Sequence, residues 1–165
     1  MKNNFVQKIA NSGLSWLWLV AAALITDQFS KHLVRSTMGF HDYSRITANL
    51  NIRFVENPGA AFSFLANGAK WQVISLTAFN LFMIGLLLLW LKRSAFDRIL
   101  YNCAVSLILA GAIGNLLDRL QFGAVTDFID LHIHGYHWPT FNFADVAICL
   151  GVMLLLFESK TKESL

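Results

Sequence analysis

Long apolar blocks alternate with shorter polar stretches along this chain. A bilayer core of about 30 Å is crossed by roughly 20 helical residues, with a range of about 17 to 25. Four blocks have that length, and the second contains no charged residue. The pattern therefore predicts an all-α integral membrane protein with four transmembrane helices, at about residues 14–34, 71–91, 99–120 and 141–157.

Two polar segments, 36–70 and 121–140, separate these blocks. In the first, apolar and polar residues alternate over Leu50-Asn51-Ile52-Arg53-Phe54, which predicts a short strand, and Pro58-Gly59 predicts a turn after it. We expect the second segment to be an exposed loop. The chain contains no internal repeat or low-complexity tract, so residues 1–165 are predicted to form a single domain.

Composition narrows the class of protein. Of the 165 residues, 56% are hydrophobic and 14% are charged, whereas a soluble domain carries about 25% charged residues. The net charge is only +3, and no window concentrates Lys and Arg, which argues against nucleic-acid binding. Cys103 and Cys149 lie inside apolar blocks, so we expect two small buried hydrophobes rather than a disulfide or a CxxC motif.

Basic residues predict the orientation of the four helices. An even number of spans puts both termini on one side, and that side would hold seven of the 13 Lys and Arg residues near span ends: Lys2, Lys8, Lys92, Arg93, Arg98, Lys160 and Lys162. The positive-inside rule then places both termini in the cytoplasm. A cleavable secretory signal is the alternative for the N-terminus, but the apolar run continues past the alanines at 21–23, which favours a retained helix.

Ionisable residues inside predicted spans mark either structural pairs or functional sites. Asp27 and Lys31 are four residues apart on one helix face, and we expect an ion pair at the helix end that reaches the membrane interface. Asn115, Asp118 and Arg119 also share a face, where packing and hydrogen bonding with neighbouring helices is the expected role.

Asp127 and Asp145 have no basic residue within four positions. If these two carboxylates converge, they share a proton and supply one general base and one general acid, as in aspartic peptidases. Spacing alone leaves open the alternative of two isolated interfacial carboxylates.

Other chemistries have weaker signals. His132, His134 and His137 could bind a metal, but no HExxH motif accompanies them, and no GxSxG motif occurs. The GAIG run at 111–114 indicates close helix packing. A proton-coupled transporter with Asp27, Asp118 and Asp145 as relay groups is the rival class, although the chain shows neither repeats nor broken helices.

Five motifs give the chain a family resemblance. It resembles the bacterial lipoprotein signal peptidases, also called signal peptidase II or aspartic peptidase family A8. The motifs follow that family's order and spacing: DQFSK at 27–31, ENPGAAFS at 56–63, GAIGNLLDR at 111–119, VTDF at 125–128 and FNFAD at 141–145.

The resemblance implies an architecture and a set of roles. The fold would be four transmembrane helices with a small extracytoplasmic β-sheet cradle from the long loop, in the bacterial inner membrane, with the active site toward the periplasm. Asp127 and Asp145 would be the catalytic dyad, with no metal or cofactor. Substrate-binding and supporting residues would be Asn57, Asn115, Asp118, Arg119 and Asn142, and Asp27 and Lys31 would form a structural pair.

The resemblance also implies the substrate. It would be a prolipoprotein that carries diacylglyceryl on its lipobox cysteine, cut on the N-terminal side of that cysteine, with membrane lipid as a partner and globomycin-type cyclic peptides as inhibitors. Three positions depart from the family pattern. Glu56 stands where Arg is common, Pro58 where a small or polar residue is common, and Thr126 where valine is usual.

Overall fold

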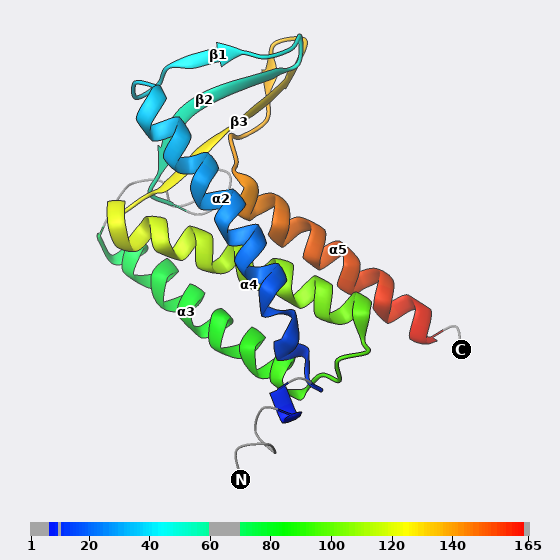
Figure 1. The fold of residues 1–165 in the computed structure, drawn as a ribbon. Helices are drawn as coiled ribbons and strands as arrows, with labels where there is room; N and C mark the ends of the chain where they lie inside the picture. The colour runs from blue at the N-terminus through cyan, green and yellow to red at the C-terminus, as the bar shows by residue number, and fades with distance from the viewer. Residues whose placement is uncertain (1–6, 10, 60–69, 164–165) are drawn as a thin grey trace.

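The computed structural model describes residues 7–9, 11–59 and 70–163. Within these ranges, a short 3-10 helix, η1 (Gly13–Trp16), precedes four long helices: α2 (Leu17–Thr37), α3 (Lys70–Arg93), α4 (Ile99–Phe122) and α5 (Phe143–Glu163). Helix α4 packs against the other three long helices, and α2 also contacts α5. Figure 1 shows a small sheet at one end of this bundle, while η1 and the end of α5 lie away from it.

The helix boundaries differ from those predicted at the first and fourth blocks. Ser12 caps η1 through a hydrogen bond from the backbone N–H of Leu14 at 3.3 Å, so the α-helix begins only at Leu17. Phe141 forms an isolated bridge with Ile129, which delays the start of α5 until Phe143. The end of α5 extends beyond the predicted 157 to Glu163, because charged residues such as Lys and Glu are good helix formers.

Two of the described helices, α3 from Trp71 onward and α4, are long and apolar enough to cross a membrane. We predicted four such segments. Asp27, Lys31 and Arg35 lower the hydropathy of α2, and the charged C-terminal part lowers that of α5. Both helices are nearly as long as α3 and α4. Their charged residues therefore explain why hydropathy alone does not identify them as membrane spans.

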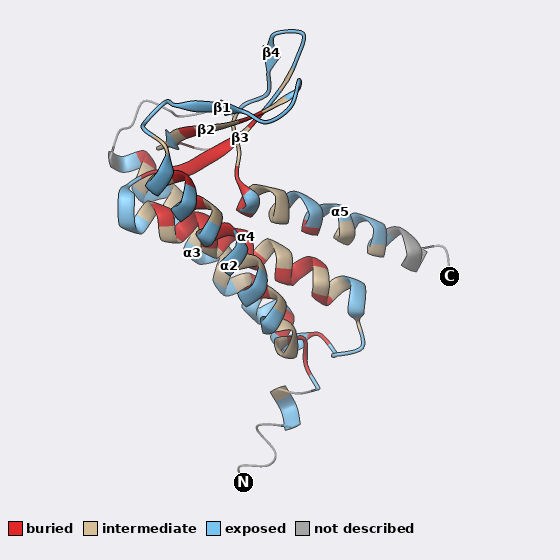
Figure 2. Cartoon of the chain, turned by 45° about the horizontal axis from the view of Figure 1, so that its top comes forward, coloured by how far each residue is buried: buried red, intermediate tan, exposed pale blue. Residues whose placement is uncertain are grey.

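Apolar side chains on the bundle face both inward and outward. The core between the helices contains Val20, Leu87, Leu91, Val105, Leu109 and Ala110. Helix α3, by contrast, exposes large apolar side chains such as Phe79 and Phe82. Helix α5 is also mostly intermediate or exposed along its length, as Figure 2 shows. An apolar surface of this kind is expected of a helix that faces lipid.

The sheet is antiparallel, with the strand order β1-β2-β3-β4. Its strands are β1 (Tyr43–Arg45), β2 (Leu50–Asn57), β3 (Val125–Ile133) and β4 (Tyr136–His137). The predicted strand at 50–54 is confirmed as part of β2. The expected small β-sheet beside the helices is confirmed, but the expectation of an exposed loop at 121–140 is wrong, because that segment supplies β3 and β4.

Two features join the sheet to the bundle. Gly123 adopts a left-handed conformation (φ 73°), and its N–H donates to Arg119 O, which ends α4 and redirects the chain into β3. Val34, Phe54 and Phe128, from α2, β2 and β3, then form a second apolar cluster. The start of β3 is therefore held against the helices on one side and against β2 on the other.

Two smaller expectations have different outcomes. Asn57 Oδ1 accepts a hydrogen bond from Gly59 N at 3.0 Å, which confirms a turn at Pro58-Gly59. The expectation that both cysteines are buried is wrong. Cys103 is half-buried, and Cys149 is exposed along the apolar face of α5.

Candidate active site

Asp127 lies on the inner half of β3 and is only 3% exposed. Both of its carboxylate oxygens accept hydrogen bonds from asparagine side chains. Asn57 Nδ2, at the end of β2, donates to Oδ2 at 3.0 Å, and Asn142 Nδ2 donates to Oδ1 at 2.7 Å. The strand pairing brings Asn57 here, because Val55 pairs with Asp127 in the β2–β3 register.

Asp145 lies in the first turn of α5 and belongs to a reciprocal cap. Asn142 Oδ1 accepts from Asp145 N at 3.0 Å, and Asp145 Oδ2 accepts from Asn142 N at 3.3 Å. This arrangement is a capping box built from Asn and Asp. Asn115 Nδ2, on α4, donates to Asp145 Oδ1 at 2.8 Å. Asn142 thus contacts both aspartates and also donates to Asn115 Oδ1 at 3.2 Å.

Both carboxylates line one cavity of about 550 Å³. We call it the apolar groove, because from Asp145 it continues along α5 past Val146, Leu150 and Met153. Burial, followed by the nearby negative charge of Asp145, raises the pKa of Asp127 to about 7. One proton on the pair near neutral pH would provide a carboxylic acid and a carboxylate in the same cavity.

A group of four charged residues lies beside this cavity, and we call it the ion cluster (Asp27, Lys31, Arg35 and Asp118). Lys31 Nζ lies 2.9 Å from Asp27 Oδ2 and 3.3 Å from Asp118 Oδ2, and Arg35 Nη2 lies 3.1 Å from Asp118 Oδ1. The predicted Asp27–Lys31 pair is confirmed. The expectation that Lys31 reaches outward to the surface is wrong, because its side chain is 0% exposed and ends against α4.

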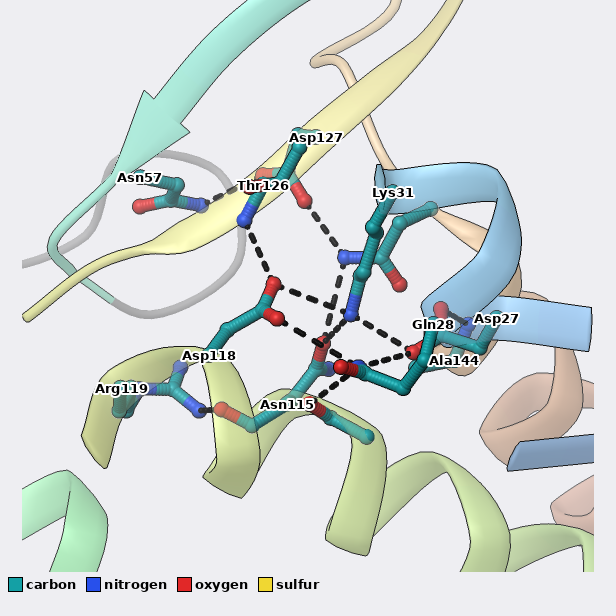
Figure 3. Close-up of polar contacts among 12 residues, drawn as sticks. Asp27, Gln28, Lys31, Asn57, Asn115, Asp118, Arg119, Thr126, Asp127 and Ala144 are labelled. Atoms are coloured by element: carbon teal, nitrogen blue, oxygen red, sulfur yellow. Dashed lines mark hydrogen bonds and ion pairs between the residues drawn. The ribbon is translucent and has the colours of Figure 1, made fainter. Parts of the chain in front are cut away.

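The ion cluster also fixes the backbone next to each aspartate, as Figure 3 shows. Asp118 Oδ2 accepts from Thr126 N at 2.9 Å, directly before Asp127. Asp27 Oδ1 accepts from Ala144 N at 2.8 Å, directly before Asp145. Because Asp27 and Asp118 are both engaged with cations and backbone groups, they are poorly suited to the proton relay of the rival transporter.

Arg119 extends from α4 into the apolar groove. Its guanidinium donates to Asn115 O and to Gly59 O, each at 3.3 Å. The positive charge is therefore held beside the two aspartates, where it can attract a substrate carbonyl or a developing negative charge.

The three histidines of the H-x-H-x-x-H motif do not form a cluster. His134 occupies the turn between β3 and β4 with φ 49°, while His132 and His137 stack with ring centroids 4.9 Å apart. His137 Nδ1 lies 2.7 Å from Asp130 Oδ1. No group of three potential ligands suited to a metal occurs among the residues that the structure describes.

Sequence reasoning did not single out several residues that build the site. Gln28 Nε2 bonds Asp27 Oδ2, Gly114 O and Asp118 Oδ1, and Arg35 completes the ion cluster. The spacing of Arg35, four residues after Lys31, was an available signal. Residues 138–140, which line the apolar groove, carried no signal, because a pattern of apolar and polar positions does not locate an irregular segment.

Comparisons with known proteins show the family to which this chain belongs. The family model described as Signal peptidase (SPase) II matches residues 19–161. A lipoprotein signal peptidase of Pseudoalteromonas translucida (strain TAC 125) is 46% identical over 93% of this chain and 92% of its own length. One from Yersinia enterocolitica serotype O:8 / biotype 1B (strain NCTC 13174 / 8081) is 42% identical over 91% of this chain and 89% of its own.

Two solved structures have the same fold. Both are described as bacterial membrane enzymes, and both are 29% identical to this chain. The structure at 2.3 Å resolution has a TM-score of 0.82 and covers 91% of this chain and 90% of its own. The structure at 1.9 Å resolution has a TM-score of 0.76, with 87% and 91% covered. This chain is therefore a membrane protein that belongs to the signal peptidase II family of aspartic-type peptidases.

Proposed function

We propose that the protein is an aspartyl endopeptidase that removes signal peptides from diacylglyceryl-modified prolipoproteins, cutting N-terminal to the lipidated cysteine. The observation that carries this proposal is the placement of Asp127 and Asp145 in one cavity, with Asn142 bonded to both. Membership of the signal peptidase II family supports the substrate class.

The proposed reaction uses the dyad and one water molecule. The ionised carboxylate takes a proton from the water, whose oxygen attacks the scissile carbonyl while the protonated carboxyl donates to the carbonyl oxygen. The resulting gem-diol collapses as a carboxyl proton moves to the leaving amine and the C–N bond breaks. Burial, then the charge of Asp145, raises the pKa of Asp127 to about 7, which supports a shared proton near neutral pH.

The surrounding polar groups have positioning and electrostatic roles in this proposal. Asn57, Asn115 and Asn142 hold the carboxylates at a fixed separation through the bonds described above. Arg119 binds substrate backbone and stabilises the charge that develops on the carbonyl oxygen. Asp118, with Asp27 and Lys31, acts as scaffold.

We further propose a membrane arrangement. All four long helices cross the bacterial inner membrane, both termini are cytoplasmic, and the sheet and the dyad lie at the periplasmic surface. The exposed apolar surface of α3 and the apolar groove along α5 support this arrangement. Because the groove is open to lipid in this orientation, it receives the apolar parts of the substrate, and cyclic peptides of the globomycin type compete for it.

The test is cleavage of a diacylglyceryl-modified prolipoprotein by the purified protein, without added metal. Removing one member of an acid–base pair lowers rates by about 10²-fold to 10⁴-fold, and we expect losses in that range from Asp127→Asn and from Asp145→Asn. Asp97→Asn is the matched control, because Asp97 is an exposed carboxylate on the α3–α4 connection. Near-normal turnover in both dyad variants would refute the assignment.

A further inference from the structure

A second cavity, of about 530 Å³, adjoins the dyad on the side of the sheet. We call it the polar cavity, because its lining includes His41, Arg53, Glu56, Asp130 and His137. The two cavities share Asn57, Asp127 and residues 138–140. Asp127 therefore lies where the two cavities meet: the apolar groove runs from it along α5, and the polar cavity lies beside the sheet.

Residues 138–140 form the wall between the two cavities, and backbone hydrogen bonds attach both ends of this wall to β3. Trp138 N donates to Leu131 O at 2.8 Å, and Phe141 N donates to Ile129 O at 3.2 Å. Residues 138–140 have no regular structure of their own. Two backbone hydrogen bonds to β3 therefore help to fix their position, and His137 directly precedes them in the chain.

His137 is attached to a buried carboxylate. Asp130 is 3% exposed, and its Oδ1 lies 2.7 Å from His137 Nδ1. Asn51 Nδ2 donates to its other oxygen at 2.9 Å. Burial opposes ionisation, but the hydrogen bonds from Asn51 and His137, with the charge of His137, hold the pKa of Asp130 below its ordinary value. Asp130 is therefore an acceptor, and His137 is the donor.

We propose that the polar cavity binds the hydrophilic peptide segment on the C-terminal side of the scissile bond, and that His137 is a positioning residue that holds the wall of this subsite through Asp130. The inference rests on the proposed function. A prolipoprotein presents an apolar signal helix on one side of the cleaved bond, whereas the chain that follows the lipidated cysteine ends in water. The polar cavity offers that chain charged and imidazole groups from the sheet, whereas the apolar groove, beyond the two aspartates and Arg119, is lined mostly by apolar side chains of α5.

The charged lining groups are available to such a ligand. Glu56 is exposed and Arg53 is half-buried, and no hydrogen bond or ion pair engages either side chain among the described residues. Asp130, by contrast, is occupied by Asn51 and His137. The structure therefore assigns ligand contact to Arg53 and Glu56 and a supporting role to the Asp130–His137 pair.

The experiment compares two lipopeptides with the same signal sequence and lipidated cysteine. The short one ends at the cysteine amide, and the long one continues for several polar residues. For the unchanged enzyme we expect a lower KM with the long peptide. His137→Leu should raise the KM of the long peptide about tenfold, which corresponds to the loss of about one good hydrogen bond, with kcat unchanged. The KM of the short peptide should rise less, because residues 138–140 also line the apolar groove.

Further variants separate positioning from folding. His137→Asn should restore the low KM, because an asparagine amide can place a donor close to the position of Nδ1. Arg53→Gln should raise the KM of the long peptide without touching the Asp130–His137 pair. His134→Asn is the matched control, since Asn tolerates the positive φ of that turn.

Three outcomes would contradict the subsite, the positioning role of His137 or the proposed function. Equal KM values for the two peptides with the unchanged enzyme would overturn the subsite. An equal effect of His137→Leu on both peptides would show a merely structural role. Failure of the unchanged enzyme to cleave either peptide would instead refute the proposed function, and the inference with it.

Discussion

Lys31 Nζ lies 3.1 Å from Asn115 Oδ1, and the amide nitrogen of the same asparagine donates to Asp145 at 2.8 Å. A fully buried cation on α2 thus sets the orientation of an amide that contacts the Asp145 carboxylate on α5. Because ammonium groups only donate, Lys31 fixes which end of the Asn115 amide faces Asp145. The ion cluster is in this way continuous with the dyad.

Loss of Lys31 should destabilise the fold. Lys31→Met removes one of two cations and leaves Asp27 buried without its cation, while Asp118 keeps only Arg35, for which the expected cost is about 3–5 kcal/mol. The measurement is chemical or thermal unfolding of the purified protein in detergent micelles. Lys92→Met, at an exposed position, is the control and should change the free energy of unfolding little. An equal effect of the two substitutions would contradict the role of the cluster.

The small residues of the GAIG run should be intolerant to added volume. A Cβ at Gly114 would collide with Asp27 Oδ2, which the ion cluster holds in place, and a Cβ at Gly111 would collide with Ala144 O. We expect Gly114→Ala to lower stability and activity together, because the clash moves the residue that anchors Ala144 beside Asp145. Overpacking typically costs about 1–3 kcal/mol.

Gly85 provides the internal comparison for that substitution. A Cβ there meets nothing within 4 Å, and the residue lies within α3. Gly85→Ala should therefore be neutral or slightly stabilising, since alanine is the better helix former. Melting temperatures of the two alanine variants, measured side by side, check the prediction, and a similar loss for both would refute it.

Asn142 has two separable roles. Its side-chain oxygen caps α5, and its side-chain nitrogen donates to Asp127. Asn142→Ser should keep the cap, because serine is a good N-cap residue, but its hydroxyl is too short to replace the amide at Asp127. We expect Asn142→Ser to retain most of the melting temperature and lose turnover, and Asn142→Ala to lose both, with about 1 kcal/mol from the cap. Equal stability of the two variants would contradict the capping role.

The pH dependence of cleavage should report the shared proton. Burial, with a further contribution from the Asp145 charge, raises the pKa of Asp127 to about 7. The proposed reaction needs one proton on the dyad, so kcat should fall as the pH rises through about 7. Cleavage rates at saturating substrate from pH 5 to 9 test this expectation, and a rate that climbs steadily to pH 9 would contradict it.

The same proton affects stability, with a defined sign. The pKa of Asp127 is higher in the folded state than its ordinary value of 3.8, because burial disfavours the charged form. Its contribution is therefore fully present below pH 3.8 and is lost as the pH rises through about 7. The melting temperature should fall over this range, and it should fall less in Asp127→Asn. An identical pH dependence in both proteins would contradict this.

Sequence patterns predicted the helices better than the sheet, for a physical reason. The four residues Val125 to Phe128 are all buried, because β3 is covered by helices as well as by β2. A strand buried in this way lacks the alternation that revealed Leu50 to Phe54. The family motif VTDF located Asp127 where periodicity could not. Asn57 reaches Asp127 even though Glu56 and Pro58 depart from the family pattern.

The ion cluster shows which contacts the spacing of residues along the chain can predict. The Asp27–Lys31 pair follows from a separation of four residues on one helix. The contacts of Lys31 with Asp118 and Asn115 join residues 87 and 84 positions apart, and nothing in the spacing of α2 and α4 indicates that they face each other. Pairs within one element were therefore predictable, and the contacts between elements that assemble the site were not.

Because β2 pairs with β3, the candidate active site is assembled from segments that lie far apart in the sequence. Asn57 and Asp127 are separated in sequence by α3 and α4, and Asp145 follows only after β4. During synthesis, β2 can pair with β1 early, but it pairs with β3 only after both intervening helices have been made. No N-terminal portion that ends before residue 145 contains both carboxylates, so the proposed dyad is complete only once the first turn of α5 has been synthesised.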